Sequence, residues 1–153
     1  MNDNNSNNQR KDVAESARVA QEIWAVPQHC YDNASRVIED VPGYESADYV
    51  EGYAIYKSHS IEHGWVEKNG VIVDPTLPRD VLTYIPGLRF TGRTGLEEAK
   101  QIPKPKHTSK DFPIFYRFGW AGQEHPEMKA AWAAVRRHIE NVERGFEESE
   151  PKS

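Results

Sequence analysis

The dipeptide Asn69-Gly70 constrains this chain more than any other feature of its sequence. It separates two runs of alternating residues, which is the strongest short signal for a β-hairpin with a type I′ turn. With these two residues in the turn, Trp65 faces Asp74 on the opposite strand. Because side chains alternate along a strand, His63 and Asp74 are predicted to be diagonal neighbours on one face, within reach of a hydrogen bond.

The other face of this hairpin is apolar and is predicted to pack against a helix. It carries the three valines Val66, Val71 and Val73. A shift of one residue in the pairing would move every side chain to the wrong face. A structure with His63 and Asp74 on opposite faces would therefore overturn this register.

A histidine beside an aspartate suits general-base chemistry, and the chain offers one cysteine as the nucleophile. In such a pair the carboxylate orients the ring, and the other ring nitrogen can take a proton. Cys30 stands at the predicted start of a helix, where backbone N–H groups and the helix dipole favour a thiolate and could stabilise an oxyanion. The alternatives are a purely structural His–Asp pair and a buried structural cysteine, since Cys30 also continues an apolar stripe with Ala34 and Ile38.

Periodicity predicts helices near both ends of the chain and strands between them. Apolar residues recur at helical spacing in three segments, 12–24, 30–39 and 126–146. Residues 48–76 alternate and are rich in β-branched and aromatic side chains, which predicts strands. Residues 84–91 and 112–120 are predicted as further strands, and the glycine- and proline-rich segment 92–113 as a surface loop.

The order of these elements predicts one α+β domain over residues 11–146. N-terminal helices pack on an antiparallel sheet, and an amphipathic helix ends the domain. A disordered Asn-rich tail is expected at 1–10 and a frayed acidic tail at 147–153. The apolar stripe of the last helix is predicted to face the core, with a homodimer through this helix as the alternative.

Composition excludes several classes of protein. The 153 residues carry a net charge of −5, which argues against nucleic-acid binding because phosphate neutralisation needs clustered Lys and Arg. No apolar run reaches the roughly 18–20 residues that span a membrane, and the N-terminus does not read as a secretory signal. We therefore expect a cytoplasmic protein. A single cysteine permits neither an intramolecular disulfide nor a CxxC metal site.

Four segments between residues 28 and 76 resemble, in order and spacing, the transglutaminase-like branch of the papain-like cysteine enzymes. They are CYDNA at 30–34, YVEGY at 49–53, HGWVE at 63–67 and VDPT at 73–76. The resemblance is to the small stand-alone members found in bacteria and their phages. It implies a papain-like fold with Cys30 as nucleophile, His63 as base and acid, and Asp74 as the orienting carboxylate. Gly64 stands where the family usually has an alanine.

The resemblance implies a cysteine-dependent acyl-transfer enzyme that acts on an amide of a protein or peptide, with no cofactor and no metal. Hydrolysis, as a protease or deamidase, is favoured over cross-linking to an amine. This preference assumes that segment 92–113 is a flexible basic lid, with Lys104, Lys106 and Lys110, that excludes water poorly. The alternative function is a non-catalytic binding module that keeps the same fold.

Two weaker sets of candidates complete the site. The oxyanion donor of the family lies upstream of the cysteine, where Gln28 and Trp24 are candidates. Trp65 shares the face of His63 and Asp74, so it is a candidate for shielding their contact or lining the substrate site.

A rival reading concerns metal binding at His59–His63. This segment spells HxxEH, which holds zinc when it is helical and a distant glutamate such as Glu140 completes the site. Gly64 and the strand-like run that follows argue against a helix there.

Overall fold

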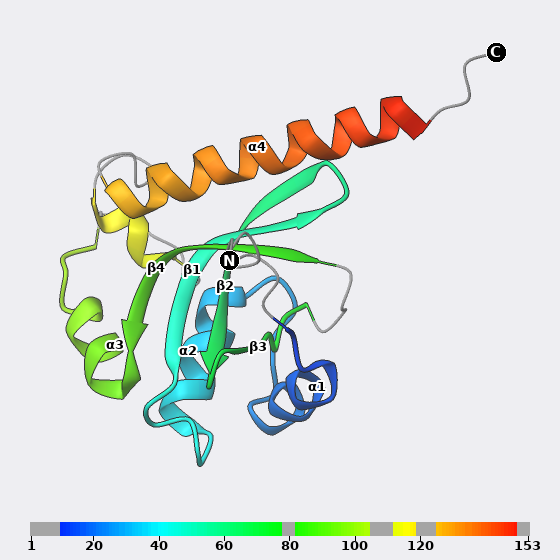
Figure 1. Ribbon diagram of the computed structural model, residues 1–153. Helices are drawn as coiled ribbons and strands as arrows, with labels where there is room; N and C mark the ends of the chain where they lie inside the picture. Colours follow the sequence, from blue (N-terminus) through cyan, green and yellow to red (C-terminus); the bar gives the residue numbers. More distant parts are fainter. Residues whose placement is uncertain (1–9, 78–81, 105–111, 119–124, 150–153) are drawn as a thin grey trace.

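The computed structural model describes residues 10–77, 82–104, 112–118 and 125–149, the last four of these by their backbone only (Figure 1). The elements in chain order are α1 (Val13–Glu22), α2 (Cys30–Asp40), β1 (Asp48–Tyr56), β2 (His59–Lys68), β3 (Val71–Val73), β4 (Thr83–Thr91), α3 (Gly92–Lys100), the 3-10 helix η1 (Ile114–Phe118) and α4 (Pro126–Ser149). The protein is therefore of the α+β class.

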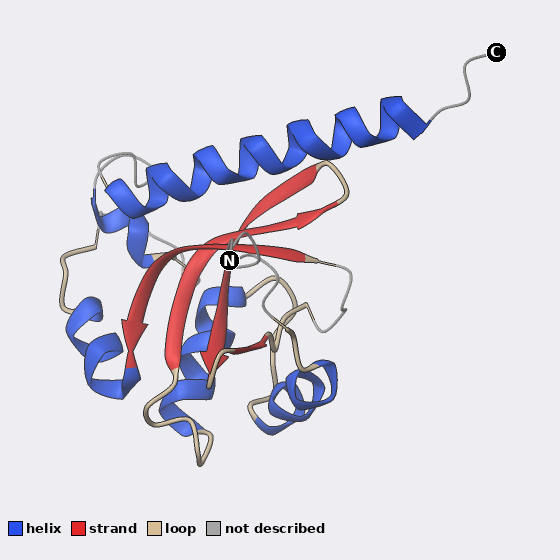
Figure 2. Cartoon of the chain, in the orientation of Figure 1, coloured by secondary structure: helices blue, strands red, loops and turns tan. Residues whose placement is uncertain are grey.

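The strands form one antiparallel sheet in the order β3-β2-β1-β4 (Figure 2). The predicted hairpin register is confirmed, because Val66 pairs with Val73 across β2 and β3. Asn69 and Gly70 both have positive φ angles, 54° and 75°, as a type I′ turn requires.

Helices α2 and α4 pack on the same face of the sheet, and α1 lies beside β3 (Figure 1). Alternation along β1 separates the two faces of the core. Tyr53 and Ile55 face the helices and join a cluster with Met128 of α4. Val50 and Ala54 of β1 face the other side and form a second buried cluster with Trp65, Ile72 and Tyr84.

The prediction of a loop over 92–113 was wrong in its first part, which forms helix α3. Gly92 has a φ of 73°, and its N–H donates to Ala47 O at 2.8 Å, so the chain turns directly from β4 into the helix. Leu96 and Ala99 are then buried in the core. The two glycines suggested a loop, whereas burial of these apolar side chains stabilises a helix.

The strand predicted at 112–120 is also wrong over its described part, since residues 114–118 form η1, and residues 119–120 lie outside the described residues. The backbone N–H groups of Ile114 and Phe115 donate to the side chain of Glu51, at 2.7 and 2.8 Å. A buried carboxylate thus accepts the hydrogen bonds that a neighbouring strand would otherwise have accepted.

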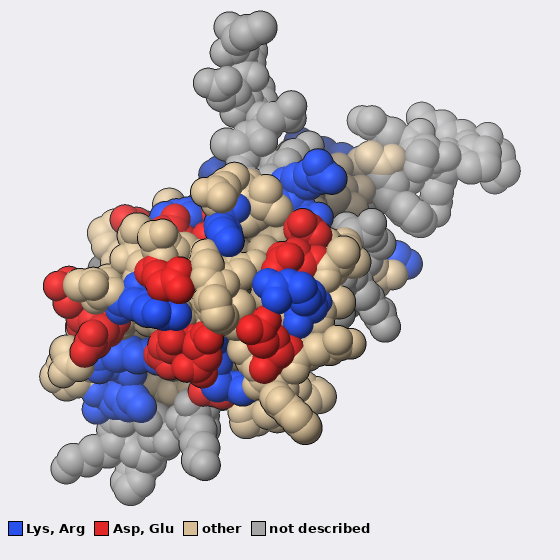
Figure 3. All heavy atoms as spheres, turned by 90° about the horizontal axis from the view of Figure 1, so that it is seen from below, with Lys and Arg blue, Asp and Glu red and all other residues tan. Residues whose placement is uncertain are grey.

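The tail predicted at 1–10 lies outside the described residues, except for Arg10, whose carbonyl accepts from Ile72 N at 2.9 Å. Helix α4 continues to Ser149, through the start of the predicted acidic tail at 147–153, and the rest of that tail is outside the described residues. Among the described helices, none combines the length and apolar character needed to cross a membrane. On the face in Figure 3, acidic and basic side chains are interspersed.

Candidate active site

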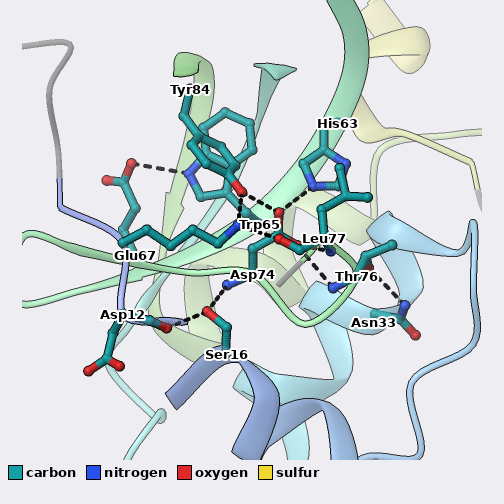
Figure 4. A network of polar contacts seen from close by, with 11 residues as sticks. Asp12, Ser16, Asn33, His63, Trp65, Glu67, Asp74, Thr76, Leu77 and Tyr84 are labelled. Atoms are coloured by element: carbon teal, nitrogen blue, oxygen red, sulfur yellow. Dashed lines mark hydrogen bonds and ion pairs between the residues drawn. The ribbon is translucent and has the colours of Figure 1, made fainter. Parts of the chain in front are cut away.

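The predicted contact between His63 and Asp74 is present. His63 Nε2 lies 2.7 Å from Asp74 Oδ2, and their side chains are 2% and 0% exposed (Figure 4). His63 is on β2, and Asp74 immediately follows β3, so the hairpin turn alone sets their approach. The contact leaves His63 Nδ1 as the ring nitrogen directed away from the carboxylate.

Four hydrogen bonds fix the carboxylate and backbone of Asp74. Its Oδ1 accepts from the N–H groups of Thr76 and Leu77, at 2.9 and 3.0 Å, which closes an Asx turn over Pro75. The hydroxyl of Tyr84 donates to Oδ2 at 2.6 Å, and Asp74 N donates to Ser16 Oγ at 2.9 Å. The orientation of Asp74 is therefore set by α1, β4 and its own turn.

These contacts keep Asp74 ionised despite its burial. Burial alone would raise the pKa of its carboxyl, but the adjacent His63, Tyr84 and the N–H of Leu77 lower it below its ordinary value. Burial and the charge of Asp74 together raise the pKa of Tyr84, so that hydroxyl stays a donor. An ionised carboxylate beside an imidazole can stabilise a positive charge on the ring.

Two aromatic rings enclose the pair. Trp65 stacks on His63, with ring centroids 6.0 Å apart and planes inclined by 21°, and its edge meets Tyr84 at 5.0 Å. Trp65 is fully buried, so it shields the pair from water rather than lining an open cleft. Its indole Nε1 donates to Glu67 at 3.2 Å.

Cys30 is the first residue of α2, as predicted, and is 8% exposed. The next residue, Tyr31, packs directly on Gly64 of β2. A Cβ on Gly64 would lie 2.8 Å from Tyr31 Cδ1 and 3.4 Å from Tyr31 Cα. The glycine therefore lets the head of α2 approach β2 at the residue after His63.

A second link joins the head of α2 to the turn that holds Asp74. Asn33 is fully buried, and its amide donates to Thr76 Oγ1 at 2.8 Å and to Val26 O at 2.9 Å. The same amide accepts from Val26 N at 3.0 Å. Asn33 thus ties together α2, the loop before Cys30 and the Asp74 turn.

The two links bring the three predicted residues to one region of β2. Strand alternation nevertheless turns His63 away from the face on which Gly64 meets α2. Cys30 itself belongs to the buried cluster on the α2 face, with Tyr31 and Tyr53.

The predicted oxyanion candidates are both at the surface. Trp24 is 85% exposed and follows α1, and Gln28 is exposed two residues before Cys30. Both residues have positive φ angles, 56° and 66°, so the loop before α2 contains two residues in a backbone conformation that residues other than glycine rarely adopt.

The alternative zinc reading fails on geometry. His59 and His63 lie on strand β2 rather than on a helix, and His59 is exposed while His63 is buried. Within the described part of the chain, no group of three or more His, Cys, Asp and Glu side chains could hold a metal ion.

A pocket of about 240 Å³ opens beside the head of α2, on the side of the sheet that α2 covers. Its walls come from four stretches of the chain: Tyr31, Asp32, Ser35, Tyr49, Lys100, Lys104, Phe112, Ile114 and Arg117. Two of these residues directly follow Cys30 in the chain. Sequence analysis missed this pocket, because it depends on how α3 and η1 fold back onto α2.

Glu51 lies fully buried in the same region and was also missed. It accepts hydrogen bonds from the Tyr49 hydroxyl and from the backbone of η1. Burial raises its pKa to about 7, even though these hydrogen bonds lower it. The sequence did contain one signal for this site: Glu51 is a single carboxylate within the apolar run Tyr49–Tyr56. A charged group buried in such a strand needs hydrogen-bond partners.

Fold and site together define a class: an α+β domain with a buried His–Asp pair beside a helix that begins with cysteine. Comparisons with models of known protein families, with curated proteins and with solved structures all give no match.

Proposed function

We propose that this protein is a cysteine-dependent acyl-transfer enzyme that acts on an amide carbonyl, with the papain-like arrangement of its helix and sheet. The observation that carries the proposal is the buried His63–Asp74 pair, enclosed by aromatic rings. A second observation supports it, because Tyr31–Gly64 packing and the Asn33–Thr76 hydrogen bond hold the head of α2 against this region.

The proposed reaction begins with proton transfer from the Cys30 thiol to His63 Nδ1. The thiolate adds to the amide carbonyl, and the tetrahedral adduct expels the amine, which takes its proton from His63. Water then adds to the thioester while His63 accepts its proton. Collapse of this second adduct releases the carboxylic acid, and the proton returns to the sulfur of Cys30.

The surrounding groups have separate tasks in this scheme. Asp74 holds Nε2, which leaves Nδ1 as the nitrogen that would accept the thiol proton, and its charge stabilises the imidazolium. Trp65 excludes water from the His–Asp contact, which strengthens it electrostatically. Backbone N–H groups at the start of α2 are the expected oxyanion donors.

We propose hydrolysis as the fate of the acyl-enzyme. The expectation of a flexible lid over 92–113, which favoured water over an amine, does not hold for residues 92–100, because they form helix α3. Amine transfer is the competing outcome. A Gln-containing peptide offered together with a labelled primary amine separates them. Release of acid faster than incorporation of the amine supports hydrolysis, and the reverse result assigns cross-linking.

Alkylation of Cys30 by iodoacetamide near pH 6 tests the triad itself. We expect fast labelling that His63→Ala slows by about tenfold or more, since loss of the base removes the thiolate. His59→Ala is the matched control, because His59 is an exposed histidine on the same strand. Equally slow labelling of all three proteins would refute the proposal and favour a binding module with a structural thiol.

A further inference from the structure

The pocket beside α2 has an unequal distribution of charge. Three cationic side chains, Lys100, Lys104 and Arg117, line it together with one carboxylate, Asp32. Asp32 Oδ2 already lies 3.0 Å from the guanidinium Nε of Arg36. The walls therefore carry more positive than negative charge, on a protein whose overall charge is negative.

Within the described part of the chain, two of the three cations form no ion pair, although the charge of Arg117 helps to lower the pKa of buried Glu51. Lys100 forms an ion pair with Glu39. Among the residues that the structure describes, no carboxylate lies within ion-pair distance of Lys104 or Arg117. These two side chains come from different segments and line the same pocket, which suits a ligand with negative charge.

The guanidinium of Arg117 is held in place before any ligand arrives. Its Nη1 donates to Lys100 O at 2.8 Å and to Ile102 O at 2.7 Å. The η1 helix that carries it is anchored by hydrogen bonds to buried Glu51. A cation fixed in this way loses little conformational entropy on binding an anion.

The pocket also has an apolar part that fits a short aliphatic chain. Phe112 and Ile114 line it, together with the ring of Tyr49. Tyr31 and Asp32 connect it to the head of α2, directly after Cys30. Cys30 itself does not line the pocket, which therefore adjoins the thiol through the two residues that follow it.

We propose that this pocket binds a carboxylate of the substrate, so that the amide attacked by Cys30 belongs to an acidic peptide. This inference rests on the proposed function for the role of Cys30, but the binding of the carboxylate is independent of catalysis. The carboxylate can be an acidic side chain or a chain terminus, and both have the same chemistry.

Two alkylating reagents of similar size test the pocket. Iodoacetate carries a carboxylate, whereas iodoacetamide is neutral. The rate of Cys30 alkylation by iodoacetate, divided by the rate with iodoacetamide, therefore reports on local positive charge. The same ratio measured for a small thiol is the reference. We expect the ratio for Cys30 to exceed that of the small thiol. Arg117→Gln and Lys104→Gln should each lower this ratio by about threefold to fivefold.

Matched variants separate charge from fold. Lys104 is exposed, so its replacement leaves the core intact. Arg117 is half-buried, and Arg117→Lys keeps the positive charge at that position. Arg137→Gln removes a cation from the exposed face of α4 and should leave the ratio unchanged. An equal loss in Arg137→Gln, or no loss in either pocket variant, would overturn the proposal.

A direct binding measurement tests the pocket even if Cys30 reacts with neither reagent. Failure of Cys30 to react would refute the proposed function but not the binding of a carboxylate. Succinate should raise the thermal midpoint of the wild-type protein and should raise it less in Lys104→Gln. N-Acetylglutamate α-amide and N-acetylglycine, used in the same way, distinguish a side-chain from a terminal carboxylate. Equal shifts in wild type and variant, or none, would show that the pocket does not bind carboxylates.

Discussion

Glu51 offers the sharpest quantitative prediction, because its carboxylate is completely buried and still titratable near neutral pH. It lies on β1, accepts two backbone N–H groups of η1 and contacts the Tyr49 hydroxyl. Replacement by Gln keeps the size of the side chain and removes the charge. Gln has a single acceptor oxygen, so one of the two backbone N–H groups loses its partner at every pH, and only the pH dependence of the stability difference reports on ionisation.

The expected magnitude follows from the pKa of this group. Burial raises the pKa of Glu51 from an ordinary 4.5 to about 7. Between these two values the folded protein keeps a proton that the unfolded chain has released, so the free energy of unfolding falls as pH rises. At about 1.4 kcal/mol per pKa unit, the loss from pH 4.5 to above pH 7 is about 3 kcal/mol. Below pH 4.5 this group contributes no pH dependence.

Urea unfolding of wild type and Glu51→Gln between pH 4.5 and 8 measures this effect. The free energy of unfolding of wild type, minus that of the variant, should fall by about 3 kcal/mol across the range, because other titrating groups cancel. The exposed Glu97→Gln should run parallel to wild type. If Glu51→Gln also runs parallel, the carboxylate does not hold its proton and the argument from burial is wrong.

Three further predictions concern the region around Asp74. Asp74→Asn should slow alkylation of Cys30 near pH 6 by about tenfold or more. Because folding lowers the pKa of Asp74, its carboxylate stabilises the folded protein above pH 3.8. The difference in unfolding free energy between wild type and Asp74→Asn should therefore shrink as the pH falls below 3.8. Thr76→Val removes the acceptor for Asn33 and should cost about 1–3 kcal/mol of unfolding free energy, whereas Thr76→Ser should cost less than half as much. Gly64→Ala, although alanine is usual in the resembling family, should cost about 1–3 kcal/mol because the new Cβ meets α2, and an unchanged urea midpoint would contradict the close packing.

Local rules were sufficient for the hairpin and for three helices. The Asn69-Gly70 turn fixes pairing between β2 and β3, and pairing fixes which side chains share a face. The contact between His63 and Asp74 follows from this alone, without knowledge of the rest of the chain. Proline and glycine misled the prediction at 92–113, because α3 is stabilised by burial of Leu96 and Ala99 rather than by local propensity.

The sequence by itself therefore determined the α+β class, the hairpin register and the identity of the His–Asp pair, since each depends on residues close together in the chain. Only the tertiary structure decided the partners that come from distant segments. Asn33 on Thr76 and the buried Glu51 under η1 are separated by 43 and more than 60 positions. No periodicity spans such separations, because these contacts arise when the helices and the sheet pack together and buried polar groups must find partners.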